Sequence, residues 1–267
     1  MSRSATMNNM QLSLFDPEPI ARPLNVLVAC EESQAVCKEF RRLGHIAWSA
    51  DLQECSGGRP EWHIRGDCLP LLGGECEFTT KDGTRHIQGG QWDLIIAHPP
   101  CTHLAVSGAA WFERKRKDGS QREGLELFCK FLDADCEHVV IENPVGIVSG
   151  NYVAEHFPDI AERYGLPRKP EQIIQPWQFG DNHSKATCLW EKGVAPLEPI
   201  VTKQPPLEWT EWTDSKTGRI KRQPKWYADA WALRPAERAK VRSRTFPGIA
   251  RAMAEQWSAY LSAGGNE

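Results

Sequence analysis

A thiol and a carboxyl group each follow directly on a short apolar run of this sequence. Cys101 comes after the run at 92–98, and Glu142 comes after the run at 139–141. Short apolar runs are typical of buried parallel strands, and open α/β sheets carry their chemistry on the loops at the carboxyl ends of such strands. We therefore expect the two groups at the same edge of one sheet, where a nucleophile and an acid would face each other.

This pair of groups suits addition to an electron-poor ring. A thiolate that adds to carbon 6 of cytosine turns the ring into an enamine and makes carbon 5 nucleophilic, provided that ring nitrogen 3 receives a proton or a strong hydrogen bond. Cys101 would supply the thiolate and Glu142 the proton. An ordinary cysteine is mostly protonated near neutral pH, so the site must lower its pKa or couple attack to ring protonation. Burial is expected to push Glu142 towards its neutral, donating form.

Each residue also has an ordinary structural interpretation. Cys101 could be one of nine small buried thiols, and Glu142 could be an ion-paired residue at a strand end. Either residue alone leaves this alternative open, whereas the two in this order and context favour the chemical interpretation.

The two motifs together resemble the catalytic pair of the DNA cytosine-C5 methyltransferases, in which a Pro-Cys element attacks the base and a Glu-Asn element holds it. The resemblance implies methyl transfer from S-adenosylmethionine to carbon 5 of a cytosine flipped out of double-stranded DNA, through a covalent cysteine adduct. The family has a Gln-x-Arg-x-Arg strand pair further on, for which Lys185 is the best cationic counterpart. The implied catalytic set is Cys101, Glu142, Asn143, Pro100 and Lys185.

The elements expected to position these residues begin with a βαβ unit. Residues 25–29 predict the first buried strand, residues 33–43 a helix with apolar side chains at i, i+4 and i+7 capped by Gly44, and residues 46–50 a second strand. Asp51 then has the spacing of the acid that binds ribose hydroxyls in a Rossmann-like nucleotide site. The expected fold class is α/β, and the resemblance implies a Rossmann-like, S-adenosylmethionine-dependent methyltransferase sheet with a small target-recognition insert.

The turn after the first strand lacks the glycine-rich loop that cytosine methyltransferases usually carry. Glu31 or Glu32 could attract the cationic groups of S-adenosylmethionine, or could be acids favoured by a helix N-terminus, and both interpretations stay open. Asp67 resembles the acid that bonds the adenine amino group in the family's third motif, although an Asp in a polar turn would look the same. The implied cofactor contacts are Ala29, Cys30, Glu31, Glu32, Asp51, Leu52, Asp67, Cys68 and Pro99.

Two polar, glycine-containing stretches interrupt these elements. Residues 73–90 predict an exposed excursion or a hairpin, and residues 108–124 predict a polar loop downstream of the nucleophile. In the resemblance the second stretch is the loop that closes over DNA, and otherwise it is an ordinary surface loop. It holds the basic residues Arg114, Lys115, Arg116 and Lys117.

Positive charge gathers in the second half of the chain, although the net charge is −3. Residues 216–251 contain eleven Lys and Arg against two acids, which favours contact with phosphate, with solvated surface faces as the alternative. Tryptophans interleaved with these cations suit a DNA-recognition region, but because Trp more often packs in a core, none is assigned a role. DNA contacts are expected at Arg219, Lys221, Arg222 and Lys225.

These assignments divide the chain into a flexible tail at 1–22, a catalytic domain at 23–195, a basic, Trp-rich recognition region at 196–242, and a helix at 243–262 that returns to pack on the catalytic domain. A further helix is expected around residues 152–164.

The tail contains a pentapeptide that closely resembles the motif with which bacterial replication and repair proteins dock on the sliding clamp. A chance apolar pentapeptide is the alternative. The residues of the pentapeptide are Gln11, Leu12, Ser13, Leu14 and Phe15.

The amino-acid composition limits the classes of protein to which this chain can belong. A chain of 267 residues, 40% of them hydrophobic, can bury a sizeable core. No long apolar run and no signal-like amino terminus is present, so we expect a soluble cytoplasmic monomer of a bacterial or phage-infected cell, without a membrane partner. Nine cysteines without a Cys-x-x-Cys pair argue against a zinc ribbon and a disulfide framework, so reduced thiols and no metal site are expected.

Two other classes of function compete with this interpretation. DNA amino-methyltransferases, which modify N4 of cytosine or N6 of adenine, carry a similar Pro-Pro element, but they need an aromatic residue where this chain has Cys101 and a polar acceptor where it has His98. They would also leave the Glu142 motif unexplained. The second competitor is an inactive, clamp-tethered DNA-binding module, which the missing glycine-rich loop makes plausible.

Overall fold

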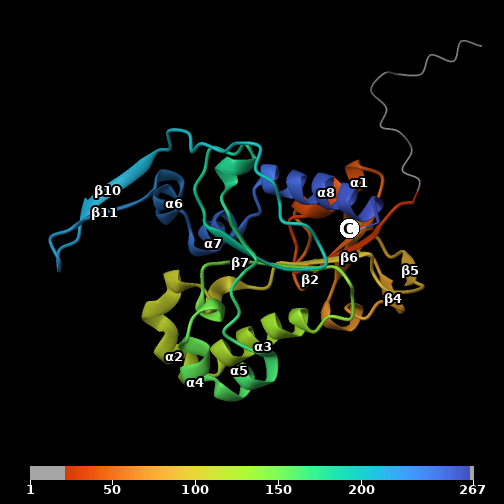
Figure 1. The fold of residues 1–267 in the computed structure, drawn as a ribbon, viewed down its shortest axis with the longest axis horizontal. Helices are drawn as coiled ribbons and strands as arrows, with labels where there is room; N and C mark the ends of the chain where they lie inside the picture. The colour runs from red at the N-terminus through yellow and green to blue at the C-terminus, as the bar shows by residue number, and fades with distance from the viewer. Residues whose placement is uncertain (1–21, 265–267) are drawn as a thin grey trace, which may run out of the picture.

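The computed structural model describes residues 22–264, which are built around a seven-stranded sheet (Figure 1). The strands of this sheet are β1 (Asn25–Ala29), β2 (Ile46–Asp51), β3 (His63–Arg65), β6 (Leu94–Ala97), β7 (Val139–Pro144), β8 (Gln172–Ile174) and β9 (Thr187–Lys192). They lie in the order β3-β2-β1-β6-β7-β9-β8. The first five are parallel, and β9 is antiparallel to both of its neighbours. The predicted α/β class is confirmed, with a mostly parallel central sheet.

The two central strands are buried on both faces, as their unbroken apolar runs predict. Every residue of β6 and all but the first residue of β1 are buried. One face of the sheet is covered by α1 (Ala35–Arg42) and α8 (Pro247–Ser262), which pack on each other. The opposite face is covered by α3 (Ser120–Leu132) and α5 (Pro158–Tyr164) (Figure 1). The core therefore lies in two apolar layers, one on each side of the sheet.

The βαβ start of the chain forms as its sequence predicts. Val36 and Phe40 point from α1 into the core, and the helix ends where Gly44 takes a positive φ of 90° and donates its N–H to the Arg41 carbonyl. The predicted helix and both predicted strands are confirmed, to within two residues at each end.

The prediction of a polar loop over residues 108–124 is wrong, because the segment is helical. It contains most of a 3₁₀ helix (Val106–Trp111), all of α2 (Phe112–Lys117) and the start of α3. Phe112 is buried and anchors α2 to the core, and Gly119, with a φ of 81°, makes the turn between the two helices. The basic cluster of this segment therefore lies on a helix rather than on a loop.

The helix predicted over residues 152–164 is present but divided. It consists of α4 (Tyr152–His156) and α5, because Pro158 lacks the N–H with which α4 would continue. The helix predicted within residues 243–262 is confirmed as α8.

Two hairpins lie outside the central sheet. The first confirms the hairpin alternative for residues 73–90, and the second extends away from the sheet on the left of Figure 1. The hairpin strands are β4 (Cys76–Thr79), β5 (Arg85–Gln88), β10 (Trp209–Thr213) and β11 (Ile220–Pro224). Between β11 and α8 come α6 (Lys225–Asp229) and α7 (Pro235–Ser243).

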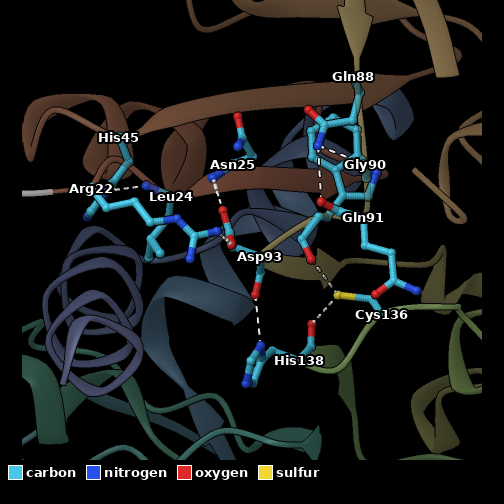
Figure 2. A network of polar contacts seen from close by, with 11 residues as sticks. Arg22, Leu24, Asn25, His45, Gln88, Gly90, Gln91, Asp93, Cys136 and His138 are labelled. Carbon is cyan, nitrogen blue, oxygen red and sulfur yellow. Dashed lines mark hydrogen bonds and ion pairs between the residues drawn. The ribbon is translucent and has the colours of Figure 1, made fainter. Parts of the chain in front are cut away.

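A network of polar contacts joins the amino ends of β1, β6 and β7 (Figure 2). Asp93, just before β6, accepts the N–H of Asn25 at 2.7 Å and the guanidinium of Arg22 at 2.6 Å. The Asp93 carbonyl accepts from Nδ1 of His138 at 2.9 Å, and the thiol of Cys136 donates to neighbouring carbonyls. These contacts join three neighbouring strands at their amino ends.

Two of the sequence predictions concern partners. Over residues 22–264, no helix is both long enough and apolar enough to cross a membrane. The pentapeptide at residues 11–15, predicted to dock on a sliding clamp, lies outside the described residues.

Candidate active site

Three neighbouring strands bring chemically active residues to one edge of the sheet. The residues that end or follow β1, β6 and β7 are Glu31, His98, Cys101 and Glu142. The strand order reverses between β1 and β6, and this switch point is where open α/β sheets bind ligands. Because β6 pairs with β7 in parallel, the prediction that Cys101 and Glu142 share one edge of the sheet is confirmed.

The loop that carries Cys101 is tied to β7 by a buried hydrogen bond. Nδ2 of Asn143 donates to the Pro99 carbonyl at 2.7 Å, and both residues are buried. Pro100 is exposed and leads into the 3₁₀ turn Cys101–His103, where the thiol is half-buried. The side chain of Asn143 therefore positions the loop that presents the thiol.

The loops after β6 and β7 also approach each other closely. Ala105 and Gly146 form a β-bridge, and the N–H of Val106 donates to the Val145 carbonyl at 3.1 Å. A Cβ on Gly146 would lie 2.6 Å from the carbonyl oxygen of Leu104, so only glycine allows this approach. The thiol loop and the strand that carries Glu142 consequently form one connected unit.

His98 is a site residue to which the sequence analysis assigned no function. Its Nδ1 lies 3.1 Å from Oε2 of Glu142, and the two side chains are only 9% and 11% exposed. Its backbone N–H donates to the Ala29 carbonyl and so joins β6 to the end of β1. Two buried atoms of the pair, Nε2 of His98 and Oε1 of Glu142, have no hydrogen-bond partner among the described residues. The only sequence signal was its position directly before the Pro-Pro element.

The expectation that burial keeps Glu142 neutral is wrong. Burial, the largest single influence, would raise the pKa of Glu142, but the charge of Lys185 and the hydrogen bond and charge of His98 together outweigh it. The pKa of Glu142 therefore lies below its usual value, and the group is a carboxylate at neutral pH. Lys185, which comes just before β9, therefore lies close enough for its charge to act on Glu142, and its predicted catalytic role stays a prediction.

The thiol of Cys101 has the opposite character. Burial and then the negative charge of Glu142 raise its pKa, while Lys185 and Arg242 act in the lowering direction without reversing the shift. Arg242 comes from α7 and was counted in the basic run at 216–251 without being assigned to the site. The folded chain shows that the charge of Arg242 acts on the thiol.

Glu31 has a structural role, which decides between its two interpretations. Its carboxylate accepts the N–H of Val36 at 2.6 Å and that of Cys37 at 3.2 Å, and so caps the start of α1. The side chain is buried, and burial raises its pKa. Glu32 is partly exposed and lies 4.0 Å from Nζ of Lys240.

The turns after β2 and β3 carry the other acids predicted to contact a cofactor. Oδ1 of Asp51 accepts the N–H of Gln53 at 2.8 Å, and Oδ1 of Asp67 accepts that of Leu69 at 3.0 Å. The Oδ2 atoms of both acids make no hydrogen bond within residues 22–264 and can accept one from a ligand. Leu52, beside Asp51, is 72% exposed.

The remaining residues of this predicted cofactor site lie at the same edge. Ala29 ends β1 and is buried, and Cys30 follows it with a positive φ of 58°. The Sγ atoms of Cys30 and Cys68 are 3.8 Å apart, so the turns after β1 and β3 meet there. These turns lie on the same side of the sheet as the thiol loop, because β3, β2, β1 and β6 are successive strands of the sheet.

Most of the basic residues of α2 have partners within the protein. Lys115 donates to the Thr102 carbonyl, Arg116 to the hydroxyl of Tyr152, and Lys117 to Glu113 at 2.7 Å. Arg114 is exposed. The contact of Lys115 with the turn that begins at Cys101 means that α2 supports the thiol loop.

The basic residues of the β10–β11 hairpin and of the start of α6 are more exposed. Lys221 pairs with Asp214 and Lys225 with Asp229, while the guanidinium of Arg222 lies 4.7 Å from the centre of the Trp209 ring. Arg219 is exposed as well. In Figure 1 the hairpin and α2 lie on the same side of the view, above and below the sheet.

This arrangement can perform nucleophilic addition coupled to proton transfer. It joins a thiol, a carboxylate, an imidazole and two cations at the switch point of a mostly parallel sheet. A comparison with models of known protein families finds no match, and neither does a comparison with curated proteins.

Proposed function

We propose that the chain is a DNA cytosine-C5 methyltransferase that uses S-adenosylmethionine as its methyl donor. One observation carries the proposal: a thiol follows β6, a carboxyl group lies near the carboxyl end of the adjacent parallel strand β7, and the amide of Asn143 ties the thiol loop to β7. Addition at carbon 6 of cytosine with protonation at ring nitrogen 3 requires a pair of this kind.

In the proposed reaction Cys101 adds to carbon 6 as a thiolate, and Glu142 delivers a proton to ring nitrogen 3. Carbon 5 thereby becomes nucleophilic and can accept a methyl group. Lys185 and Arg242 stabilise the thiolate, since both lower the pKa of Cys101. After methyl transfer, the loss of the carbon 5 proton, the departure of the cysteine sulfur and the return of the nitrogen 3 proton restore the aromatic ring.

S-adenosylmethionine, when bound, would supply an electrophilic methyl group. The residues at the ends of β2 and β3 fit it, because Oδ2 of Asp51 suits a ribose hydroxyl and Oδ2 of Asp67 an adenine amino group. Exposed Leu52 offers an apolar contact for a flat ring. Glu31 is not part of this proposal, because its carboxylate caps α1.

Double-stranded DNA is the proposed substrate, and the target base must leave the stack to reach the thiol. Support comes from a guanidinium group on the β10–β11 hairpin that is held over an aromatic ring, that of Arg222 at 4.7 Å from the centre of the Trp209 ring. Such stacking orders an arginine in advance, which favours phosphate contact.

The test is mass spectrometry of nucleosides from DNA treated with the protein and S-adenosylmethionine. Wild type should produce 5-methylcytosine and should form a covalent adduct with DNA that contains 5-fluorocytosine. Cys101→Ser should do neither, because an alcohol is a far weaker nucleophile at neutral pH. Cys76→Ser, which changes a thiol on the β4–β5 hairpin, is the matched control and should retain both activities.

The same measurement separates the alternatives. An amino-methyltransferase would produce N4-methylcytosine or N6-methyladenine without an adduct, and Cys101→Ser would remain active. An inactive DNA-binding module would give no modified base and no donor binding in a calorimetric titration.

A further inference from the structure

The contact between His98 and Glu142 leaves the carboxylate with one occupied and one unoccupied oxygen. A carboxylate can only accept hydrogen bonds, so Nδ1 of His98 carries the hydrogen and donates to Oε2 at 3.1 Å. Oε1 is buried and has no partner within residues 22–264. A buried carboxylate oxygen without a partner is costly unless it has a use, so this atom identifies the working end of the group.

The resting protonation states raise a question about the proposed reaction. Addition needs a thiolate at Cys101 and a proton at ring nitrogen 3, whereas the pKa of Cys101 is raised and that of Glu142 is lowered. At rest the site therefore holds a thiol and a carboxylate. The proton that the ring requires is on the sulfur.

We propose that His98 is a positioning residue that holds Glu142 by Oε2, so that Oε1 takes the proton of the Cys101 thiol and passes it to ring nitrogen 3. This inference rests on the proposed function. In the first step the S–H bond breaks, the Oε1–H bond forms and the sulfur bonds to carbon 6, while the C5–C6 double bond shifts to C4–C5 and the electron pair of the C4–N3 double bond moves onto ring nitrogen 3. In the second the Oε1–H bond breaks and the N3–H bond forms. Protons balance without an external acid or base.

The surroundings of the pair are consistent with this division of roles. The charged and titratable groups that interact with His98, Glu142 or the Cys101 thiol come from the turn after β1, the thiol loop, the segment before β9, β9 itself, and α7. Glu31 acts on His98, Lys185, Cys188 and Cys101 interact with Glu142, and Arg242 acts on Cys101. Both carboxylate oxygens of Glu31 are occupied by α1, which leaves Glu142 as the acid with an oxygen available for the thiol proton.

The test compares His98→Ala with His98→Asn in the pH dependence of methyl transfer. His98→Ala removes a hydrogen bond that lowers the pKa of Glu142, so this pKa rises and the acidic limb of the rate profile moves to higher pH. The rate at neutral pH should fall by about 10- to 100-fold, because the carboxylate loses its orientation. His98→Asn places an N–H donor where Nδ1 stood, so it should restore most of the rate and return the limb towards that of wild type.

Three controls make the result decisive. His138→Asn changes a histidine at the opposite end of β7, where Nδ1 bonds the Asp93 carbonyl, and should leave the profile unchanged. Donor affinity, measured by calorimetry, should be the same in all variants. If His98→Ala does not fold, His98→Leu, which is closer in volume and also lacks a donor, takes its place with the same expected shift.

The outcomes separate the inference from the function on which it rests. An acidic limb and a rate that do not change in His98→Ala would overturn the role of His98, even if wild type methylates cytosine. Equal losses in His98→Ala and His98→Asn with no movement of the limb would also overturn it, since that pattern indicates only damaged packing. Absence of 5-methylcytosine and of a 5-fluorocytosine adduct in wild type would instead refute the proposed function.

Discussion

Glu142 and Cys101 influence each other's protonation, and this coupling shapes what each can do. The carboxylate raises the pKa of the thiol, and the charge of Lys185, which lowers the pKa of the carboxyl group, also acts to lower the pKa of the thiol. Neither group is therefore tuned alone. Thiol and carboxylate together hold one proton, which either group can carry. A nucleobase whose ring nitrogen accepts this proton would leave Cys101 as a thiolate.

Glu142→Gln should change two measurements in opposite directions. Methyl transfer should fall by about 10²-fold or more, because an amide cannot pass on a proton. Alkylation of Cys101 by iodoacetamide, followed on its peptide by mass spectrometry, should become faster at a pH below the thiol's pKa, since loss of the negative charge lowers that pKa. Slower alkylation would show that Glu142 does not act on the thiol through its charge.

The sequence identifies some of these residues and cannot identify others. Cys101 and Glu142 stand out because each follows an apolar run that must be a strand. His98 and Arg242 give no such signal, because their roles depend on which strands pair and on where α7 returns to the sheet. The ionisation of Glu142 was missed for the same reason: burial can be predicted from sequence, but the charges that oppose it come from distant segments.

Among the elements, strands and crossover helices were predictable wherever apolar spacing was regular. The α2–α3 segment was not, because its glycines and charges resemble those of a loop. Gly124 shows why the resemblance misleads: it lies inside α3, and a Cβ there would come 3.1 Å from Cβ of His103. Gly124 is small because α3 packs closely on His103 there, and the sequence alone does not distinguish such a glycine from one that makes a turn.

Gly146→Ala should loosen the unit formed by the loops after β6 and β7. The added Cβ would meet the Leu104 carbonyl at 2.6 Å, so the bridge between Ala105 and residue 146 must shift. The free energy of unfolding should fall by about 1–3 kcal/mol in urea denaturation, and adduct formation should slow because the thiol loop moves. Gly150→Ala, which adds a Cβ in open space, should change neither. Identical behaviour of the two variants would refute the argument.

On the scale of the whole molecule, the sheet separates two tasks. The amino ends of its central strands are joined by the network around Asp93, and the carboxyl ends of its parallel strands carry the thiol, the carboxylate and the acids Asp51 and Asp67. Basic surface is added outside the sheet by α2 and the β10–β11 hairpin. A partner could therefore be recognised at the periphery without disturbing the residues that perform the chemistry.

Replacement of Leu14 and Phe15 by Ala should remove binding to a bacterial sliding clamp and leave methylation of short duplexes unchanged. The pentapeptide precedes β1, and its two apolar side chains would be the anchor of such docking. Surface plasmon resonance on immobilised clamp measures the first effect, and nucleoside mass spectrometry the second. A wild-type protein that does not bind the clamp would reduce the motif to chance. Loss of both activities would show that this segment serves the enzyme itself.

The packing of α8 on α1 has a consequence for how the protein is made. α1 ends at Arg42 and α8 begins at Pro247, so the ribosome releases the first long before it has translated the second. Until α8 emerges with Trp257, which becomes fully buried, the apolar residues of β1 and α1 on that face lack their cover. A nascent chain consequently exposes this face to chaperones until α8 is made, and the fold is complete only after translation has passed α8.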